Sequence, residues 1–155
     1  MIDLTHGATP EQLAVVYTDP YILRTGHDGR PAYPVFSPIA SYLSAWIDGV
    51  FSGLFLAVRV CKCEIDVHAL LLQSAIRESR GLGRLFINWC FSDAEVLRIT
   101  AYVIEGLETA RNYTARLGFI QEGFRRDAYT INGKPRGVYV MGMTRKDWSA
   151  YQWAV

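Results

Sequence analysis

The sequence is poor in cysteine, histidine and proline: its 155 residues include three Cys, three His and six Pro. Three cysteines make no disulfide framework. No histidine lies at a zinc-site spacing from the Cys61-Lys62-Cys63 motif, so we expect reduced, mostly buried thiols and no bound metal. The longest apolar run, Val50 to Val60, is interrupted by polar residues and is far shorter than the roughly 18 residues of a membrane span. The sequence therefore predicts no membrane partner.

An excess of charge of one sign is also missing, since the formal net charge is +1. A dedicated nucleic-acid binder carries a clear basic excess, so we expect no nucleic-acid partner. Half of the residues are hydrophobic, which excludes a disordered chain, and the length suits one compact domain. The segment Met1 to Thr5 lacks the basic and apolar regions of a signal peptide, so the expected compartment is the cytoplasm.

Local signals place the secondary structure in order. Thr9 reads as an N-cap, with Pro10 at the first helical position and Gln12 completing a capping box, and this helix should run to about Tyr17. The segment from Asp19 to Pro38 is dense in Pro and Gly and reads as a long irregular loop.

Strand signals dominate from residue 41 onward. Asp48-Gly49 and Asn132-Gly133 are two-residue hairpin turns between β-rich runs. The predicted strands cover residues 41–47, 50–60, 63–72, 97–104, 119–130 and 136–144, and the predicted helices cover 73–93, with its regular part starting near Arg80, and 105–117. Three consecutive strands followed by crossover helices indicate a mixed α/β sheet.

Four segments, taken in order, resemble one superfamily. They are the hairpin Trp46–Gly53, the helix start Arg80–Ile87, the helix end Ala110–Phe119 with its Leu-Gly-Phe, and the closing pair Gly123–Tyr129 and Met141–Trp148. Over about Ser41 to Trp148 the chain resembles the GNAT superfamily of N-acetyltransferases. The resemblance implies a single α/β domain, residues 1–155, with a mostly antiparallel central sheet of about six to seven strands flanked by helices. Residues 1–40 would be a variable helix and loop, 41–148 the core and 149–155 an aromatic tail.

The resemblance also implies acetyl-CoA as cofactor, with its pyrophosphate held by Arg80, Gly81, Leu82, Gly83 and Arg84. Glycines would let the backbone approach the phosphates, while helix N–H groups and the helix dipole face them. Two positions depart from the family pattern. Glu78 stands where Gln or Arg is usual, and Thr114 replaces the Tyr that protonates the departing thiolate.

Direct acetyl transfer to a primary amine, either a protein or peptide N-terminus or a small molecule, requires a base. Alternation places Glu64, Asp66 and His68 on one face of the third predicted strand. His68 lies nearest to the expected gap between the parallel strands and has a suitable ordinary pKa, with Asp66 as the second candidate base. Tyr113, one residue before Thr114, is the candidate acid.

A non-catalytic alternative stays open. His68, Arg80-Gly81 and the Gly123–Arg126 stretch also resemble phage-encoded GNAT-like proteins, some of them virion-associated. A degenerate GNAT fold would then serve as an interaction or assembly module, located in the virion. The aromatic tail, with Trp148, Tyr151 and Trp153, would dock on its own domain or bind a partner, including a second copy of the chain.

Overall fold

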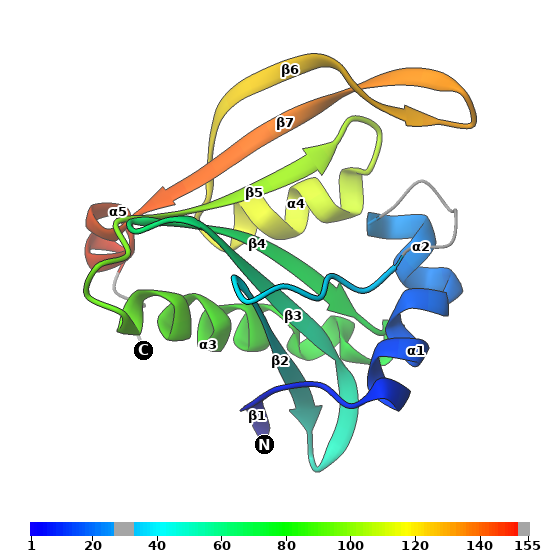
Figure 1. Ribbon diagram of the computed structural model, residues 1–155, viewed down its shortest axis with the longest axis vertical. Coiled ribbons are helices and arrows are strands. Elements are labelled where there is room, and N and C mark those ends of the chain that lie inside the picture. Colours follow the sequence, from blue (N-terminus) through cyan, green and yellow to red (C-terminus); the bar gives the residue numbers. More distant parts are fainter. Residues whose placement is uncertain (27–32, 152–155) are drawn as a thin grey trace.

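The computed structural model describes residues 1–26 and 33–151 and is built around one twisted sheet (Figure 1). The strands are β1 (Ile2–His6), β2 (Ala40–Ile47), β3 (Val50–Cys61), β4 (Glu64–Leu71), β5 (Arg98–Ile104), β6 (Ile120–Ile131) and β7 (Lys134–Thr144). The helices are α1 (Pro10–Thr18), α2 (Pro20–Gly26), the 3-10 helix η1 (Gln73–Glu78), α3 (Ser79–Ser92), α4 (Glu108–Arg116) and α5 (Arg145–Ala150).

The seven strands lie in the order β1-β2-β3-β4-β5-β7-β6. Every neighbouring pair is antiparallel except β4 and β5, which are parallel and connected by η1 and α3. A parallel pair needs such a crossover connection. The predicted mixed, mostly antiparallel α/β sheet flanked by helices is therefore confirmed.

Helices cover both faces of the sheet. The larger core lies under α3 and α4, where Phe55 stacks on Phe86 with ring centroids 4.5 Å apart. A smaller core lies under α1 and α2, where Val16 and Leu54 are fully buried. Because Leu54 and Phe55 are neighbours on β3, their side chains point to opposite faces and contribute one residue to each core. Among the described residues, no helix combines the length and the apolar character needed to cross a membrane.

The structure confirms the helix cap and the two hairpin turns that the sequence predicted. Thr9 and Gln12 form the predicted capping box at the start of α1. Asp48 and Gly49 have φ values of 49° and 77°, as the two positions of a type I′ turn require, and Asn132 and Gly133 repeat the pattern at 50° and 74°.

Three elements differ from the expectation. The first strand, β1, was not predicted, and it pairs with β2 from Ile2 opposite Ile47 to His6 opposite Leu43. The segment expected to be an irregular loop contains α2, which begins at Pro20 and has Ile22 buried. The chain also forms α5 after β7, with a capping box between Thr144 and Asp147. Residues 27–32 of the expected loop lie outside the described residues.

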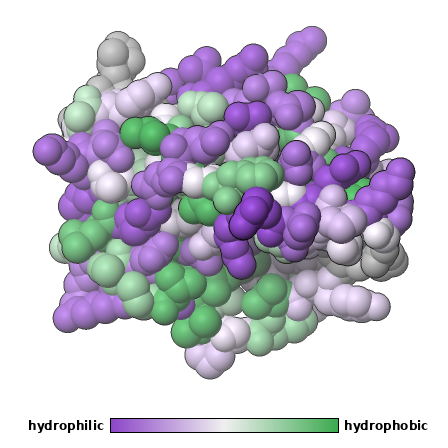
Figure 2. Space-filling view, turned by 90° about the horizontal axis from the view of Figure 1, so that it is seen from above, coloured by the Kyte–Doolittle hydropathy of each residue, from purple (hydrophilic) through white to green (hydrophobic). Residues whose placement is uncertain are grey.

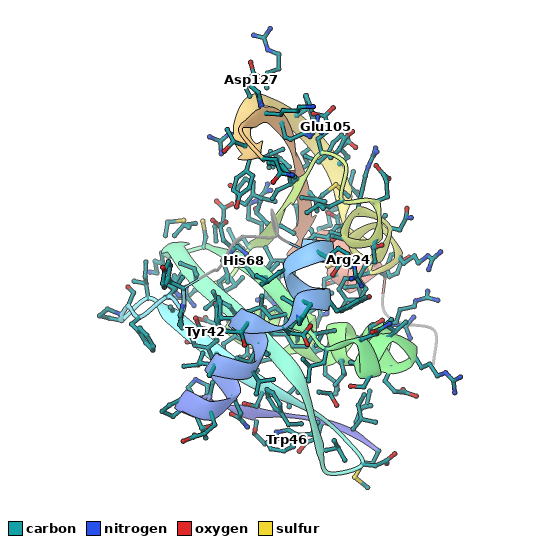
Figure 3. All side chains as sticks on the ribbon, turned by 90° about the vertical axis from the view of Figure 1, so that its right-hand side faces the viewer. Arg24, Tyr42, Trp46, His68, Glu105 and Asp127 are labelled. Atoms are coloured by element: carbon teal, nitrogen blue, oxygen red, sulfur yellow. The ribbon has the colours of Figure 1, made fainter. Side chains whose placement is uncertain are left out.

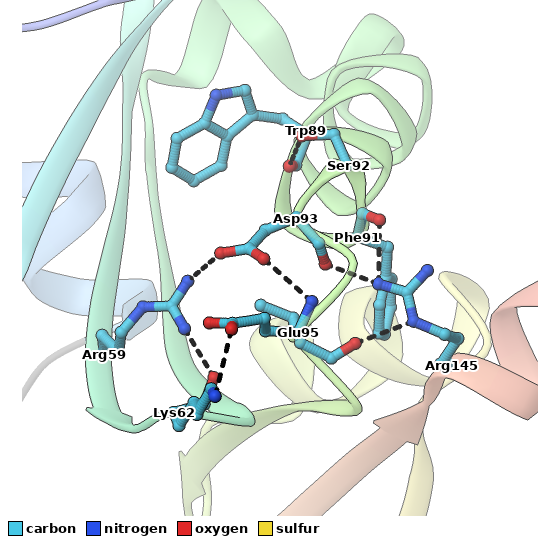
Figure 4. Close-up of polar contacts among 9 residues, drawn as sticks. Arg59, Lys62, Trp89, Phe91, Ser92, Asp93, Glu95 and Arg145 are labelled. Carbon is cyan, nitrogen blue, oxygen red and sulfur yellow. Dashed lines mark hydrogen bonds and ion pairs between the residues drawn. The ribbon is translucent and has the colours of Figure 1, made fainter.

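One arginine fixes the end of α3 to the start of α5. The Arg145 guanidinium donates hydrogen bonds to the carbonyl oxygens of Phe91, Asp93 and Val96, at 3.0, 2.6 and 2.9 Å (Figure 4). These carbonyls lie at or just beyond the end of α3, where helical carbonyls lack intrahelical partners. Arg145 therefore caps α3 and positions the connection that leads into β5.

Candidate functional site

The parallel strands β4 and β5 separate shortly after they meet. Their pairing covers Glu64 with Arg98, Ile65 with Ile99 and Asp66 with Thr100, and past this point the two strands diverge (Figure 1). Beyond Asp66, every second residue of β4 directs its N–H and C=O toward the side that β5 has left. The divergence leaves main-chain polar groups facing a gap in the middle of the sheet. Near the open end of the gap, α2 and α4 come into contact.

Polar side chains line one face of the sheet beside this gap. Ile65 and Val67 point into the larger core, so Glu64, Asp66 and His68 lie on the opposite face, as the alternation predicted. The same face of β5 carries Arg98, Thr100 and Tyr102, and Glu122 joins them from β6. Seen from above the β6–β7 end, the surface is mostly hydrophilic, with apolar residues gathered along one edge (Figure 2).

Glu64 and Glu122 are both held by Arg98. The guanidinium of Arg98 lies 3.3 Å from the Glu64 carboxylate and donates a 2.5 Å hydrogen bond to Glu122. The Thr100 hydroxyl donates to Glu64 at 2.7 Å and accepts from Arg98. These contacts fix both glutamates in place.

Asp66 lies where the strands begin to part. Its Oδ1 atom is buried and has no hydrogen-bond partner among the described residues. Burial raises the pKa of the Asp66 carboxyl, the nearby Glu64 carboxylate raises it further, and Arg98 opposes the change. A carboxylate with an unpartnered oxygen and a raised pKa is a suitable proton acceptor.

Tyr102 is a neighbour of Asp66 that the sequence reasoning missed. Burial raises the pKa of the Tyr102 hydroxyl, as do the charges of Asp66 and Glu64, while Arg125 and Arg98 lower it. The period-two alternation that selected the polar face of β4 extends to Arg98, Thr100 and Tyr102 on β5. Applied to both strands, the same pattern would have found them.

His68 lies one pleat beyond Asp66 on the same face of β4, where its side chain is exposed. In the antiparallel pairing of β3 with β4, His68 lies opposite Leu56, at a position where β5 has already diverged. Figure 3 shows His68 near the middle of the molecule, between the end of the sheet that carries Trp46 and the β6–β7 hairpin that carries Asp127. The structure thus brings the two predicted bases, Asp66 and His68, together beside the gap.

The predicted phosphate-binding residues occupy the first turns of α3. Gly81 and Gly83 lie within the helix, where an added Cβ would come within 2.6 Å of Ile2 and of the Tyr113 hydroxyl respectively. Packing against α4 therefore explains Gly83, whereas the neighbour of Gly81 is only the flexible end of the Ile2 side chain. Leu82 is fully buried, Arg80 is exposed and Arg84 is half-buried. From this group, the arginine side chains and the first-turn N–H groups are what a phosphate could contact.

Tyr113 is locked between α4 and α3. Its hydroxyl donates a 2.9 Å hydrogen bond to the Ser79 carbonyl, and burial raises its pKa. Thr114, at the position of the family's tyrosine, is buried and donates to the carbonyl of Ala110 in its own helix. In this geometry the Tyr113 proton is engaged in holding the two helices together.

The sequence matches one protein family and a curated relative. The profile of a family described as "Protein of unknown function (DUF2824)" matches residues 11–153. The chain belongs to the DUF2824 family. A second match is YdaF of Bacillus subtilis (strain 168), whose name assigns it to ribosomal N-acetylation. It is 28% identical over 65 residues, which cover 42% of the DUF2824 chain and about a third (36%) of YdaF.

Solved structures show the fold of this DUF2824 protein. A spermidine N-acetyltransferase from Vibrio cholerae, crystallised with CoA and spermine, superposes with a TM-score of 0.78 at 13% identity and covers 94% of the DUF2824 chain and 98% of its own. Another structure, assigned as an acetyltransferase, gives a TM-score of 0.79 at 14% identity, with coverage of 96% and 86%. The predicted GNAT fold is therefore confirmed for this family member.

Two further expectations for the DUF2824 chain concern its cysteines and metal binding. Cys61 is exposed and Cys63 half-buried, so of the three thiols only Cys90 is buried, and the expectation of mostly buried thiols was wrong. The reason is that Cys61 and Cys63 flank the β3–β4 turn. Within the described residues, no group of three or more His, Cys, Asp or Glu side chains is arranged to hold a metal ion.

The tail begins on the domain's own surface. Trp148 stacks on Phe91 with ring centroids 5.2 Å apart, and its indole N–H donates to Asn88 at 2.8 Å. The ring of Tyr151 lies beside Gly118. Trp153 lies outside the described residues.

Proposed function

We propose that the protein is an N-acetyltransferase that transfers an acetyl group from acetyl-CoA directly to a primary amine. The observation that carries the proposal is the buried, unpartnered oxygen of Asp66 at the point where β4 and β5 part. This carboxylate lies beside the point where β4 continues without β5 as a neighbour. A base and hydrogen-bond donors directed at one space are what amine acetylation requires.

The charges around the gap favour a cationic acceptor. Glu64, Asp66 and Glu122 contribute three carboxylates, which Arg98 offsets only in part. An alkyl ammonium ion would be attracted to this face, and its proton could pass to the Asp66 carboxyl group once the amine displaces the side chains that cover Oδ1. Transfer of the ammonium proton to Asp66 leaves the neutral amine as the nucleophile. A polyamine or a peptide amino group satisfies this description, and the Vibrio cholerae relative was crystallised with spermine.

Acetyl-CoA, when bound, supplies the acetyl group as a thioester. The N–H groups of β4 beyond Asp66 would donate to the thioester oxygen and stabilise the charge that develops on it. The Ser79 N–H already donates to the Ile76 carbonyl, so the groups of α3 proposed to bind phosphate are the N–H groups after Ser79 and the Arg80 and Arg84 side chains. His68, on the same face as Asp66, is the second candidate base, one pleat further from the strand junction.

The leaving thiolate must gain a proton as it departs. Tyr113 can donate only if its hydrogen bond to the Ser79 carbonyl breaks. A thiol has an ordinary pKa of about 8.5, so a thiolate departs with less help than an alkoxide does. Solvent is therefore a sufficient proton source for a slower enzyme.

The test measures binding and turnover in the same preparation. Calorimetry with acetyl-CoA and an acetylation assay with spermidine and with a peptide bearing a free amino terminus should both give a signal. Asp66→Asn keeps the shape of the side chain and should lower turnover by roughly 10²-fold or more, with acetyl-CoA affinity nearly unchanged. His68→Ala, assayed in parallel, shows which of the two is the base.

Glu95→Gln is the matched control, because it removes a carboxylate that pairs with Lys62 at the surface, away from the gap. This variant should keep full turnover. Absence of acetyl-CoA binding at about 1 mM, near the upper end of ordinary substrate affinities, would refute the enzyme proposal. Full turnover in both Asp66→Asn and His68→Ala would refute the assignment of the base.

The alternative, an interaction or assembly module, has its own supporting observations. Glu78 and Thr114 depart from the catalytic pattern, and Tyr33 and Phe36 are 84% and 78% exposed. An enzyme would act in the cytoplasm, whereas a module of this kind would belong in an assembled particle. Lost self-association and unchanged thermal stability on deletion of residues 149–155, together with no acetyl-CoA binding, would favour the module.

A further inference from the structure

Two thiols lie side by side at the turn between β3 and β4. Cys61 ends β3 and Cys63 immediately precedes β4, and their Sγ atoms are 3.6 Å apart. Cys61 is exposed and Cys63 is half-buried, so solutes in solution can reach the pair. This cluster is separate from the face that carries Asp66 and His68, because Cys63 and Ile65 alternate with Glu64 and Asp66.

Main-chain contacts fix the turn that carries the thiols. The Cys63 carbonyl accepts hydrogen bonds from the N–H groups of Leu97 and Arg98, at 2.8 and 3.1 Å. The Lys62 carbonyl accepts from Arg59 at 2.7 Å, and the Lys62 ammonium pairs with Glu95 at 3.2 Å (Figure 4). These contacts hold both ends of the Cys-Lys-Cys motif in place. The two sulfur atoms are therefore held near each other, and they must approach from 3.6 Å to about 2.05 Å to form a bond.

The two thiols are chemically unequal. The backbone N–H and the thiol of Cys63 donate to Cys61, which lowers the pKa of the Cys61 thiol. Donation to Cys61 raises the pKa of the Cys63 thiol. Cys61 is also the more exposed of the two thiols. Because a small disulfide must reach the attacking sulfur, we assign Cys61 as the attacking thiol and Cys63 as the resolving one.

We propose that Cys61 and Cys63 form a redox-active dithiol that exchanges with low-molecular-weight disulfides of the glutathione class. The Cys61 thiolate attacks one sulfur of the disulfide, forms a mixed disulfide and releases one thiolate. Cys63 then loses its proton and attacks Cys61 Sγ, which releases the second thiol and forms the Cys61–Cys63 disulfide. Two protein thiols are oxidised and one small disulfide is reduced to two thiols, so atoms and electrons balance.

Cys90 supplies an internal control. It is 1% exposed within the larger core, and burial raises the pKa of its thiol to about 12. A buried thiol with almost no thiolate at neutral pH should react far more slowly than the turn. Oxidation confined to Cys61 and Cys63 would therefore indicate that the protein reacted in its folded state, whereas glutathione on Cys90 would indicate that it had unfolded.

The experiment treats the folded chain with oxidised glutathione and follows intact mass and peptide maps. The wild type should lose two hydrogen atoms, retain no glutathione, carry a Cys61–Cys63 link and recover on addition of reduced glutathione. Cys63→Ser should stop at one glutathione on Cys61. Cys61→Ser should react at least about tenfold more slowly, because only the less exposed thiol remains.

Two results would overturn the proposal. One is a wild-type protein that stays fully reduced, or that carries one glutathione on each turn cysteine with no internal link. The other is equal reactivity of Cys90 and Cys61 while the melting curve is unchanged. Both are read on the wild type, so neither depends on the folding of a variant.

Discussion

Gly83→Ala should destabilise the protein, although the same change in an ordinary helix stabilises it. Replacing a helix-interior Gly by Ala gains about 1 kcal/mol of helix propensity. At position 83 the new methyl group would come within 2.6 Å of the Tyr113 hydroxyl and 2.8 Å of the Leu117 methyl groups. Overpacking of this kind costs about 1–3 kcal/mol, and displacing Tyr113 from Ser79 removes a hydrogen bond of about 1 kcal/mol.

The expected net loss is about 2 kcal/mol, which corresponds to a fall in melting temperature of roughly 4–8 °C for a chain of this length. Chemical denaturation of Gly83→Ala, Tyr113→Phe and the double variant measures the coupling between the two residues. Tyr113→Phe alone should cost about 1 kcal/mol, since it removes the hydrogen bond. In the double variant the clash with the hydroxyl is gone, so the losses should fall short of additivity by about 1 kcal/mol.

Gly81→Ala is the matched control in the same helix. Its Cβ would meet the terminal methyl group of Ile2, which can rotate away, so this variant should be neutral or more stable by up to about 1 kcal/mol. Additivity within about 0.5 kcal/mol in the Gly83–Tyr113 cycle would refute the argument. It would mean that Gly83 is not required by the packing of α3 on α4.

Three further predictions concern other parts of the fold. Because burial raises the pKa of Asp66, the charge of this carboxylate destabilises the fold at neutral pH. Asp66→Asn should therefore raise the melting temperature at pH 7. The gain should shrink on acidification to about pH 4, where the carboxyl group of the wild type is protonated. Arg145→Lys should lower the unfolding free energy by about 2 kcal/mol in denaturant titrations, because the three N–H donors of an ammonium lie on one nitrogen, whereas the guanidinium reaches the carbonyls from two. Thr9→Ala should cost about 1 kcal/mol through loss of the capping box, whereas Thr9→Ser should retain it.

Elements specified by short-range chemistry were predictable. A two-residue turn with left-handed φ values and a reciprocal capping box are settled within four residues of chain, so the hairpins and α1 followed from sequence. The strand β1 was missed because it has five residues and becomes a strand only by pairing with β2. Similarly, α2 was missed because its proline begins the helix, whereas the density of Pro and Gly around it indicated a loop.

The sequence predicted which residues share the face of the site, but it did not predict the role of each residue. Alternation found the face that carries Asp66 and His68. It could not show that Asp66 Oδ1 is left unpartnered while Glu64 is held by Arg98, because that distinction depends on residues about 35 positions away. The two glycines of α3 show the opposite error. The motif explained both by a ligand, whereas the structure explains Gly83 by the close approach of α4 and leaves room at Gly81 for a methyl group if the Ile2 side chain rotates.

The short junction between β4 and β5 also has a consequence for the cooperativity of the fold. Three residue pairs connect a four-stranded half, β1 to β4, with a three-stranded half made of β5, β7 and β6. Such a seam should open at a lower free energy than either half, because α3 and side-chain contacts such as those of Arg98 with Glu64 supply most of the other links between the halves. Amide hydrogen exchange should therefore be fastest, among the central strands, in β4 beyond Asp66. The protein can then widen this gap without unfolding the sheet on either side.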